Sequence, residues 1–405
     1  MTQGNLPRIT FGAVCFFLLT LTLGSSPTIL QAQEPIRVLA ISHEVGFPRE
    51  ISFTLEAEGD DEIREVTLYY RITASRSLVY GYPVFEPGHK IRARLSQKTD
   101  GGSYLPPGVE IEYYYIIKDS RDRELETEHG RFAYLDTRFN WHEIRHGSVS
   151  VVWHDRSEAE VTKVTQVVLK RLKDVNDTLG LELKQQARAV IFNSTRESDQ
   201  AFPFLSSTIA REHVFGGFAY PNYNLFLLTG LDPDGMIHEL THILLHQGRD
   251  SPLAVIPAWL DEGLAMYFET SSGTRELILA RAARSNRLMS LTAMSAIPGR
   301  PQDIETFYAQ AWSIVRYLMD SHGHEKMRHL IRSINDGKSL GQAMEDAYGF
   351  GTAELEKEWL SLVATQTPFL TRQEISSLII VVGIALFLLL FFIKRIVSKH
   401  SNAHN

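Results

Sequence analysis

Cysteine is almost absent from this sequence of 405 residues, because Cys15 is the only one. The chain can therefore form no internal disulfide. Positive charge is in the minority: the formal net charge is −7, and no stripe of lysine and arginine with interleaved aromatic residues occurs. We therefore expect no nucleic-acid partner. The composition, 44% hydrophobic and 22% charged, is that of a folded protein rather than a disordered one.

Two apolar segments near the ends of the chain lack charge altogether. The run at residues 11–23 follows Arg8 and ends in small and polar residues, a pattern typical of a secretory signal over residues 1–33. An uncleaved membrane anchor is the alternative interpretation. The run at residues 375–393 is long enough, at about 1.5 Å per residue, to cross a hydrocarbon core of about 30 Å. It predicts one transmembrane helix, with the lipid membrane as a partner.

Basic residues follow this second run directly. Lys394, Arg395 and Lys399 predict that residues 394–405 form a cytoplasmic tail, because positive charge gathers on the cytoplasmic side of a membrane. The preceding chain would then be the extracytoplasmic ectodomain of a single-pass protein of the cell membrane. An ectodomain without disulfides favours a prokaryotic source.

Residues 35–137 alternate between apolar and polar side chains in short runs. Examples are residues 51–55 and 109–119, and turn residues such as Pro106-Pro107-Gly108 lie between the runs. The pattern predicts an all-β, immunoglobulin-like sandwich. We find no residues in it with a chemical role, so we expect a spacer or docking domain.

The period of the pattern changes over residues 148–365. Three strands are predicted between residues 148 and 228, with a helix at Glu158–Leu179 after the first. Beyond Asp232 the chain is almost wholly helical. A mixed sheet followed by a helical half predicts an α+β domain.

The candidate chemistry begins in the segment His238-Glu239-Leu240-Thr241-His242. A spacing of four brings both imidazoles to one face of a helix, where they can bind one metal ion. Glu239 follows the first histidine and would reach a water molecule beside the metal, take its proton and pass it to a leaving amine. By itself the pattern also fits an amphipathic helix whose histidines face outward.

A second amphipathic helix begins at Pro257 and contains Glu262. Catalytic zinc has three protein ligands and a water, so we predict Glu262 as the third ligand of one Zn²⁺ per chain. Asp261 is then a helix cap or a support for a ligand. His246 lies one turn past His242, but three successive turns of one helix cannot close around one ion.

The two motifs together resemble the gluzincin metallopeptidases. His238-Glu239-Leu240-Thr241-His242, followed by Trp259-Leu260-Asp261-Glu262-Gly263-Leu264-Ala265, is most similar to the peptidase MA-like domain, a relative of the aminopeptidase-N family. The similarity continues in order through Tyr308-Ala309-Gln310-Ala311-Trp312 and ends at Leu355-Glu356-Lys357-Glu358-Trp359-Leu360. The resemblance implies a zincin-like catalytic domain over residues 148–365, in which His238, His242 and Glu262 bind zinc and Glu239 is the general base.

The resemblance also suggests two further roles. Gluzincins commonly present a tyrosine or histidine to the oxyanion, and Tyr308 is the candidate here; an aromatic residue of the helical core is the alternative. Gly216-Gly217-Phe218-Ala219 and the strand Asn224–Leu228 lie where such enzymes place an edge strand that pairs with extended substrate; an ordinary sheet strand is the alternative. Met266 occupies the position of the thermolysin-type aspartate, so support for the histidines must come from elsewhere.

The sequence therefore predicts a membrane-anchored, extracytoplasmic zinc metallopeptidase that hydrolyses a peptide or protein substrate. No Gly-Ala-Met-Glu-Asn-like segment is present to anchor a free N-terminus, which favours an endopeptidase. The alternative is a non-catalytic surface binding protein that uses a peptidase-like fold. The presence of both Glu239 and Glu262 favours activity, because an inactive copy would be free to lose them.

Overall fold

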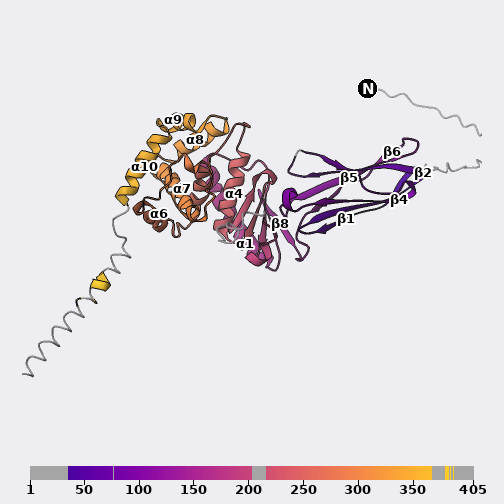
Figure 1. Cartoon of the computed structure of the whole chain (residues 1–405), viewed down its shortest axis with the longest axis horizontal. Helices are drawn as coiled ribbons and strands as arrows, with labels where there is room; N and C mark the ends of the chain where they lie inside the picture. The colour runs from indigo at the N-terminus through magenta and orange to yellow at the C-terminus, as the bar shows by residue number, and fades with distance from the viewer. Residues whose placement is uncertain are drawn as a thin grey trace, which may run out of the picture.

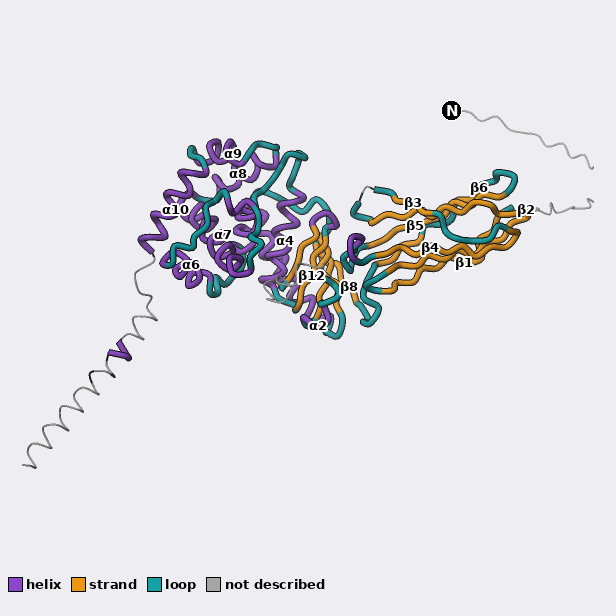
Figure 2. Tube along the Cα trace, viewed as in Figure 1, coloured by secondary structure: helices purple, strands orange, loops and turns teal. Residues whose placement is uncertain are grey.

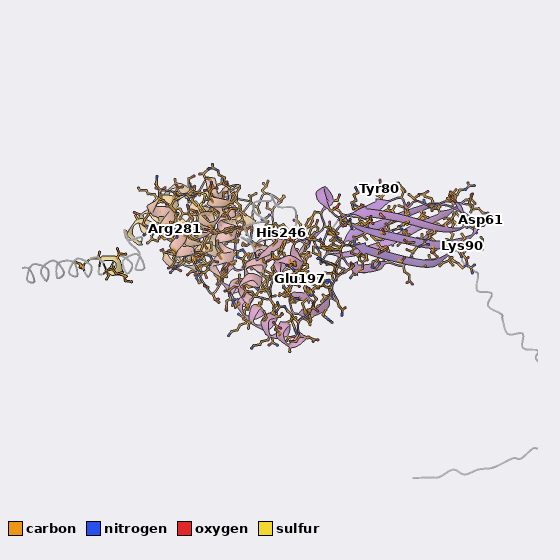
Figure 3. The ribbon with its side chains drawn as sticks, turned by 60° about the horizontal axis from the view of Figure 1, so that its bottom comes forward. Asp61, Tyr80, Lys90, Glu197, His246 and Arg281 are labelled. Atoms are coloured by element: carbon orange, nitrogen blue, oxygen red, sulfur yellow. The ribbon has the colours of Figure 1, made fainter. Side chains whose placement is uncertain are left out.

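The computed structural model describes residues 35–75, 77–202, 216–366, 379–382, 384 and 386. Figure 1 shows three parts along the long axis of the molecule: a strand-rich region at one end, a helical region at the other, and a smaller sheet between them. The parts follow one another in the order of the chain. Figure 3 marks the free tip of the strand-rich region by Asp61 and Lys90 and the helical end by Arg281.

The N-terminal region, which we call the β-region, is a seven-stranded sheet over the described part of residues 35–133. Its strands are β1 (Ile36–Gly46), β2 (Glu50–Ile72), β3 (Val79–Gly81), β4 (Gly88–Lys98), β5 (Glu110–Asp119), β6 (Glu124–Glu126) and β7 (Gly130–Ala133). The long strand β2 changes partners near its middle: β1 and β4 pair with its first half, and β3 and β5 pair with its second half. The ring of Phe53 in the first half lies 5.8 Å from that of Tyr70 in the second half, so the two halves face each other as layers.

The central sheet contains five strands in the described residues. They are β8 (His142–His146), β9 (Val149–Trp153), β10 (Ala187–Phe192), β11 (Gly217–Tyr220) and β12 (Leu225–Thr229). Their spatial order is β11-β12-β10-β9-β8, with β9, β10 and β12 parallel and the two outer strands antiparallel. Helix α1 (Glu158–Leu179) connects β9 to β10, and the short α2 (Thr195–Ser198) follows β10.

The parallel strands of this sheet are buried on both faces, which explains their nearly continuous apolar sequences. Alternate residues enter two different cores, because successive side chains of a strand point to opposite faces. Val151 and Ile191 pack with the helices. Their neighbours Val152 and Val190 pack in one core with the β-region. The β-region therefore forms the second layer over the central sheet.

The helices of the second half are α4 (Pro233–Gln247), α5 (Ala258–Tyr267), α6 (Arg275–Arg284), α7 (Pro301–His322), α8 (His324–Asn335), α9 (Leu340–Tyr348) and α10 (Thr352–Gln366). Figure 2 shows them gathered beyond the central sheet, on the side away from the β-region. α4 packs against α1, α5 and β11, and α5 packs against α7. Gly263 allows this last approach, because a Cβ there would lie 2.5 Å from the carbonyl oxygen of Ala311.

The strand-rich beginning and the helical second half agree with the predicted fold class, but the predicted membrane span does not. In the part of the chain that the structure describes, no helix is both long enough and apolar enough to cross a membrane. This finding contradicts the transmembrane helix predicted at 375–393 and the single-pass, cell-membrane localisation that rested on it. The prediction rested on the length and the apolar composition of the run, which indicate that a segment could span a membrane, whereas a span needs a helix of about 20 residues.

Within that predicted range the structure describes only residues 379–382, 384 and 386. The predicted signal at 1–33 and the predicted tail at 394–405 lie outside the described residues.

Candidate metal centre

Helix α4 carries both histidines of the predicted motif. Asp232 caps the helix by accepting a hydrogen bond from the backbone N–H of Gly235, and Pro233 occupies its first turn. The helix thus begins at Pro233, and the rings of His238 and His242 lie edge to face with their centroids 5.0 Å apart. Both side chains are mostly buried, with exposed fractions of 17% and 12%.

Glu262 on α5 reaches the same point. Its Oε2 atom lies 3.5 Å from Nε2 of His238 and 3.6 Å from Nε2 of His242. Ligand atoms held about 2.0–2.1 Å from a tetrahedral zinc ion are about 3.4 Å apart, so the three atoms are spaced as such a site requires. Oε2 is buried and has no hydrogen-bond partner, which a bound cation would supply. The residues therefore fit a divalent metal.

The other nitrogen of each histidine meets a carboxylate. Nδ1 of His238 lies 2.8 Å from Oε1 of Glu269, and Nδ1 of His242 lies 3.0 Å from Oδ1 of Asp261. With Nδ1 as the donor, each ring presents the lone pair of Nε2 toward Glu262. Glu269 also forms an ion pair with Arg275 at the start of α6.

These contacts supply the support for the histidines that the sequence left open. Of the two roles considered for Asp261, helix cap or support for a ligand, its contact with Nδ1 of His242 agrees with the second. Glu269 was missed, because it lies just beyond the end of α5 and only the tertiary fold brings it to His238.

Charges around the histidines alter their proton affinity in the metal-free site. Burial alone would lower the pKa of His242, but Asp261 and Glu262 outweigh it and raise the pKa to about 9. Burial likewise opposes protonation of His238, and the nearby carboxylates of Glu262 and Glu269 outweigh that effect and leave its pKa well above 6.5. A metal must therefore displace protons from this site.

Glu239 lies beside the group and is only 6% exposed. Burial raises its pKa, and the nearby histidines partly oppose that rise. The strand β11 runs directly against it: a Cβ on Gly217 would lie 2.6 Å from Oε1 of Glu239. Glycine is the residue that permits this close approach.

A cavity of about 520 Å³ opens beside His238 and Glu239. Tyr308, on α7, lines the same cavity, together with Gly217 of β11 and Glu305 of α7. Burial raises the pKa of Tyr308, and the charges of Glu262 and Glu239 raise it further. Its phenol therefore stays protonated at neutral pH and can donate a hydrogen bond.

His246 does not join the centre. Within the described residues, His238, His242 and Glu262 are the one group of histidine, cysteine, aspartate and glutamate whose ligand atoms come close enough to hold an ion. Figure 3 shows His246 in the middle part of the molecule, and burial lowers its pKa.

Fold and site together define a class: an α+β domain in which two helices present a His-His-Glu group beside a buried glutamate. A family model described as the Peptidase MA superfamily matches residues 165–365. The chain thus contains a domain of the Peptidase MA superfamily, as the sequence predicted, and that domain is peptidase-like.

Two further comparisons complete this result. A search of curated proteins finds no match. The crystal structure of an aminopeptidase N family protein from Idiomarina loihiensis is similar over 81% of this chain and 73% of its own, with 12% sequence identity and a TM-score of 0.33. A likeness of that size carries no further argument here.

Proposed function

We propose that the protein is a zinc-dependent metallopeptidase whose substrate is an extended peptide or protein segment. The observation that carries this proposal is the convergence of Nε2 of His238, Nε2 of His242 and Oε2 of Glu262, with Glu239 buried beside them. When bound, Zn²⁺ supplies a Lewis acid that polarises a carbonyl group and acidifies water.

Glu239 is the general base in this proposal. Its carboxylate takes a proton from the attacking water and delivers it to the amide nitrogen that leaves. The raised pKa of Glu239 supports the role, because a carboxyl group with a pKa nearer neutrality is a better proton acceptor and can return the proton later.

Tyr308 is the proposed donor to the oxyanion. It lines the cavity next to Glu239, and its phenol O–H is held in the protonated state by burial. A donor aimed at the developing negative charge stabilises the transition state more than the ground state. Its loss would therefore lower kcat more than it raises KM.

The position of strand β11 supports the proposal that the substrate is an extended chain. This strand is one of the two edge strands of the central sheet, paired with β12 over four residue positions, and it borders the cavity at Gly217. An extended peptide can add to such an edge by main-chain hydrogen bonds, which places its scissile carbonyl beside the metal group. This arrangement favours internal cleavage of a chain over removal of a terminal residue.

Zinc content and hydrolysis of a diverse peptide library test the proposal, with the full chain compared to Glu239→Ala and His238→Ala. We expect one zinc per chain in the wild type, zinc without cleavage in Glu239→Ala, and loss of zinc in His238→Ala. His246→Ala is the matched control, a histidine of the same helix outside the metal group.

Two other results would contradict the proposed function. Stoichiometric zinc without cleavage by the wild type would favour a binding protein with a peptidase-like fold. The absence of stoichiometric metal from the wild type would refute the ligand assignment.

A further inference from the structure

The β-region is joined to the central sheet by a continuous core. The outward-facing residues Val152, Val190 and Leu227 of that sheet are fully buried in one cluster with residues of the β-region. The approach is close: a Cβ on Gly108, which follows Pro106-Pro107, would lie 2.4 Å from Cγ2 of Val190. Because such a core fixes the relative position of its two sides, groups carried by the β-region hold defined positions over the sheet.

Tyr104 uses this position to reach the edge of the sheet. It follows the short turn at Gly101–Ser103 in the β-region. Its hydroxyl donates to the carbonyl oxygen of Ala201 at 2.6 Å and lies 2.7 Å from the hydroxyl of Tyr220. Since the single proton of Tyr104 is used on Ala201, Tyr220 must be the donor in the second bond. The result is a chain of hydrogen bonds from β11 through Tyr104 to the segment after α2.

Tyr220 ends β11, the strand whose other end contacts the candidate base. Gly217 lies three residues earlier in the strand, against Oε1 of Glu239. β11 is short, and within the described residues β12 is its one strand partner. The charge of Glu239 contributes to the raised pKa of Tyr220, after burial and the contact with Tyr104, which agrees with this proximity.

We propose that the β-region helps to position the candidate active site. In this proposal Tyr104 is a positioning residue that holds β11 beside Glu239. The inference rests on the proposed function for its kinetic consequence, since it concerns how an extended substrate is aligned. An edge strand held only by its pairing with β12 would shift along that neighbour more readily than one that is also bonded through the Tyr220 side chain. Weaker pairing of an extended substrate with a displaced β11 raises KM.

The test is Tyr104→Phe in the full chain, which removes the hydroxyl and keeps the ring. Hydrogen exchange of the β11 amides should become about tenfold faster, because local opening of the strand loses one buried hydrogen bond. For peptides long enough to pair with β11, KM should rise about tenfold, while the shortest substrate that is cleaved should change little. Zinc content should be unchanged.

Two further variants separate positioning from a general effect on folding. Tyr134→Phe is the matched control: it removes another buried hydroxyl of the β-region, whose bond goes to Thr99 and not to the central sheet. Tyr220→Phe removes the other partner of Tyr104 and should reproduce the effect. Both changes break the Tyr104–Tyr220 bond, and Tyr104→Phe also loses the bond to Ala201, so the double variant should be no worse than Tyr104→Phe alone.

The following outcomes would support or overturn the role of Tyr104. Unchanged exchange of β11 in both Tyr104→Phe and Tyr220→Phe would overturn the proposal, as would equal effects of Tyr104→Phe and Tyr134→Phe. If Tyr104→Phe does not fold, Tyr220→Phe alone carries the same test. If the wild type cleaves no peptide, the proposed function fails, and hydrogen exchange still supports or overturns the role of Tyr104.

Discussion

Replacing Glu269 by alanine removes the carboxylate that contacts Nδ1 of His238. In the structure this contact is 2.8 Å long, and Glu269 also pairs with Arg275, so both charged partners are affected. The histidine then loses the acceptor that fixes its tautomer and raises the basicity of Nε2. We expect zinc to bind more weakly, because the ring of His238 is held less firmly, although all three ligands remain.

The size of the effect follows from the kind of bond that is lost. A hydrogen bond to a charged group contributes about 1.5–3 kcal/mol. At about 1.4 kcal/mol for each factor of ten, the zinc dissociation constant should rise by about 10- to 100-fold. Because the Glu269 side chain is 15% exposed, some water can replace it, and the lower part of this range is the better expectation.

Competition against a chromophoric chelator at neutral pH measures this constant on the full chain. Glu305→Ala is the control, since Glu305 is a carboxylate of the same cavity outside both histidine–carboxylate pairs. Asp261→Ala, which removes the partner of His242, should weaken zinc binding to a similar extent. A change of less than about threefold in both Glu269→Ala and Asp261→Ala would refute the role assigned to the second ring nitrogens.

Three further predictions concern protons, stability and the edge strand. Because the metal-free site holds the pKa of His242 at about 9, zinc binding at pH 7 should release protons and tighten as pH rises toward 9; calorimetric heats that do not depend on the buffer would contradict this. Burial would raise the pKa of Asp234, but bonds from Thr270 and Arg171 leave it below 3.8. Its contribution is therefore present above pH 3.8 and lost as pH falls through the lower folded value, so Asp234→Asn should destabilise the fold by about 1–3 kcal/mol at pH 7 and not at strongly acid pH, as denaturant titrations would show. Gly217→Ala should lower kcat/KM about tenfold or more with zinc content unchanged, because the added Cβ would lie 2.6 Å from Oε1 of Glu239; full activity would contradict the close approach of β11.

Local periodicity made much of the metal centre predictable from sequence. His238 and His242 share a helix face because a helix repeats every 3.6 residues, and the structure has them on one helix with ring centroids 5.0 Å apart. Glu262 could be selected as a third ligand because zinc needs one more and a second helix follows closely. The change from alternating strands to helices was likewise a matter of local pattern.

What the sequence could not supply are the relations between distant segments. No spacing connects Glu269 with His238, or Tyr104 with Tyr220, because these pairs meet only when separate elements pack. The β-region was predicted to be a spacer or docking domain for the same reason. Its pattern predicts strands and two layers, but only the tertiary structure places one end of it on the central sheet.

The membrane prediction is a further example of what the sequence alone did not determine. The run at 375–393 was interpreted from its length and apolar composition, which indicate that a segment could cross a membrane without fixing the helix that a span requires. Short-range spacing along the chain thus determined which residues can bind a metal and which can accept a proton. Packing of buried side chains decided which carboxylates contact the histidines and which strand lies against Glu239, because those contacts depend on the whole fold.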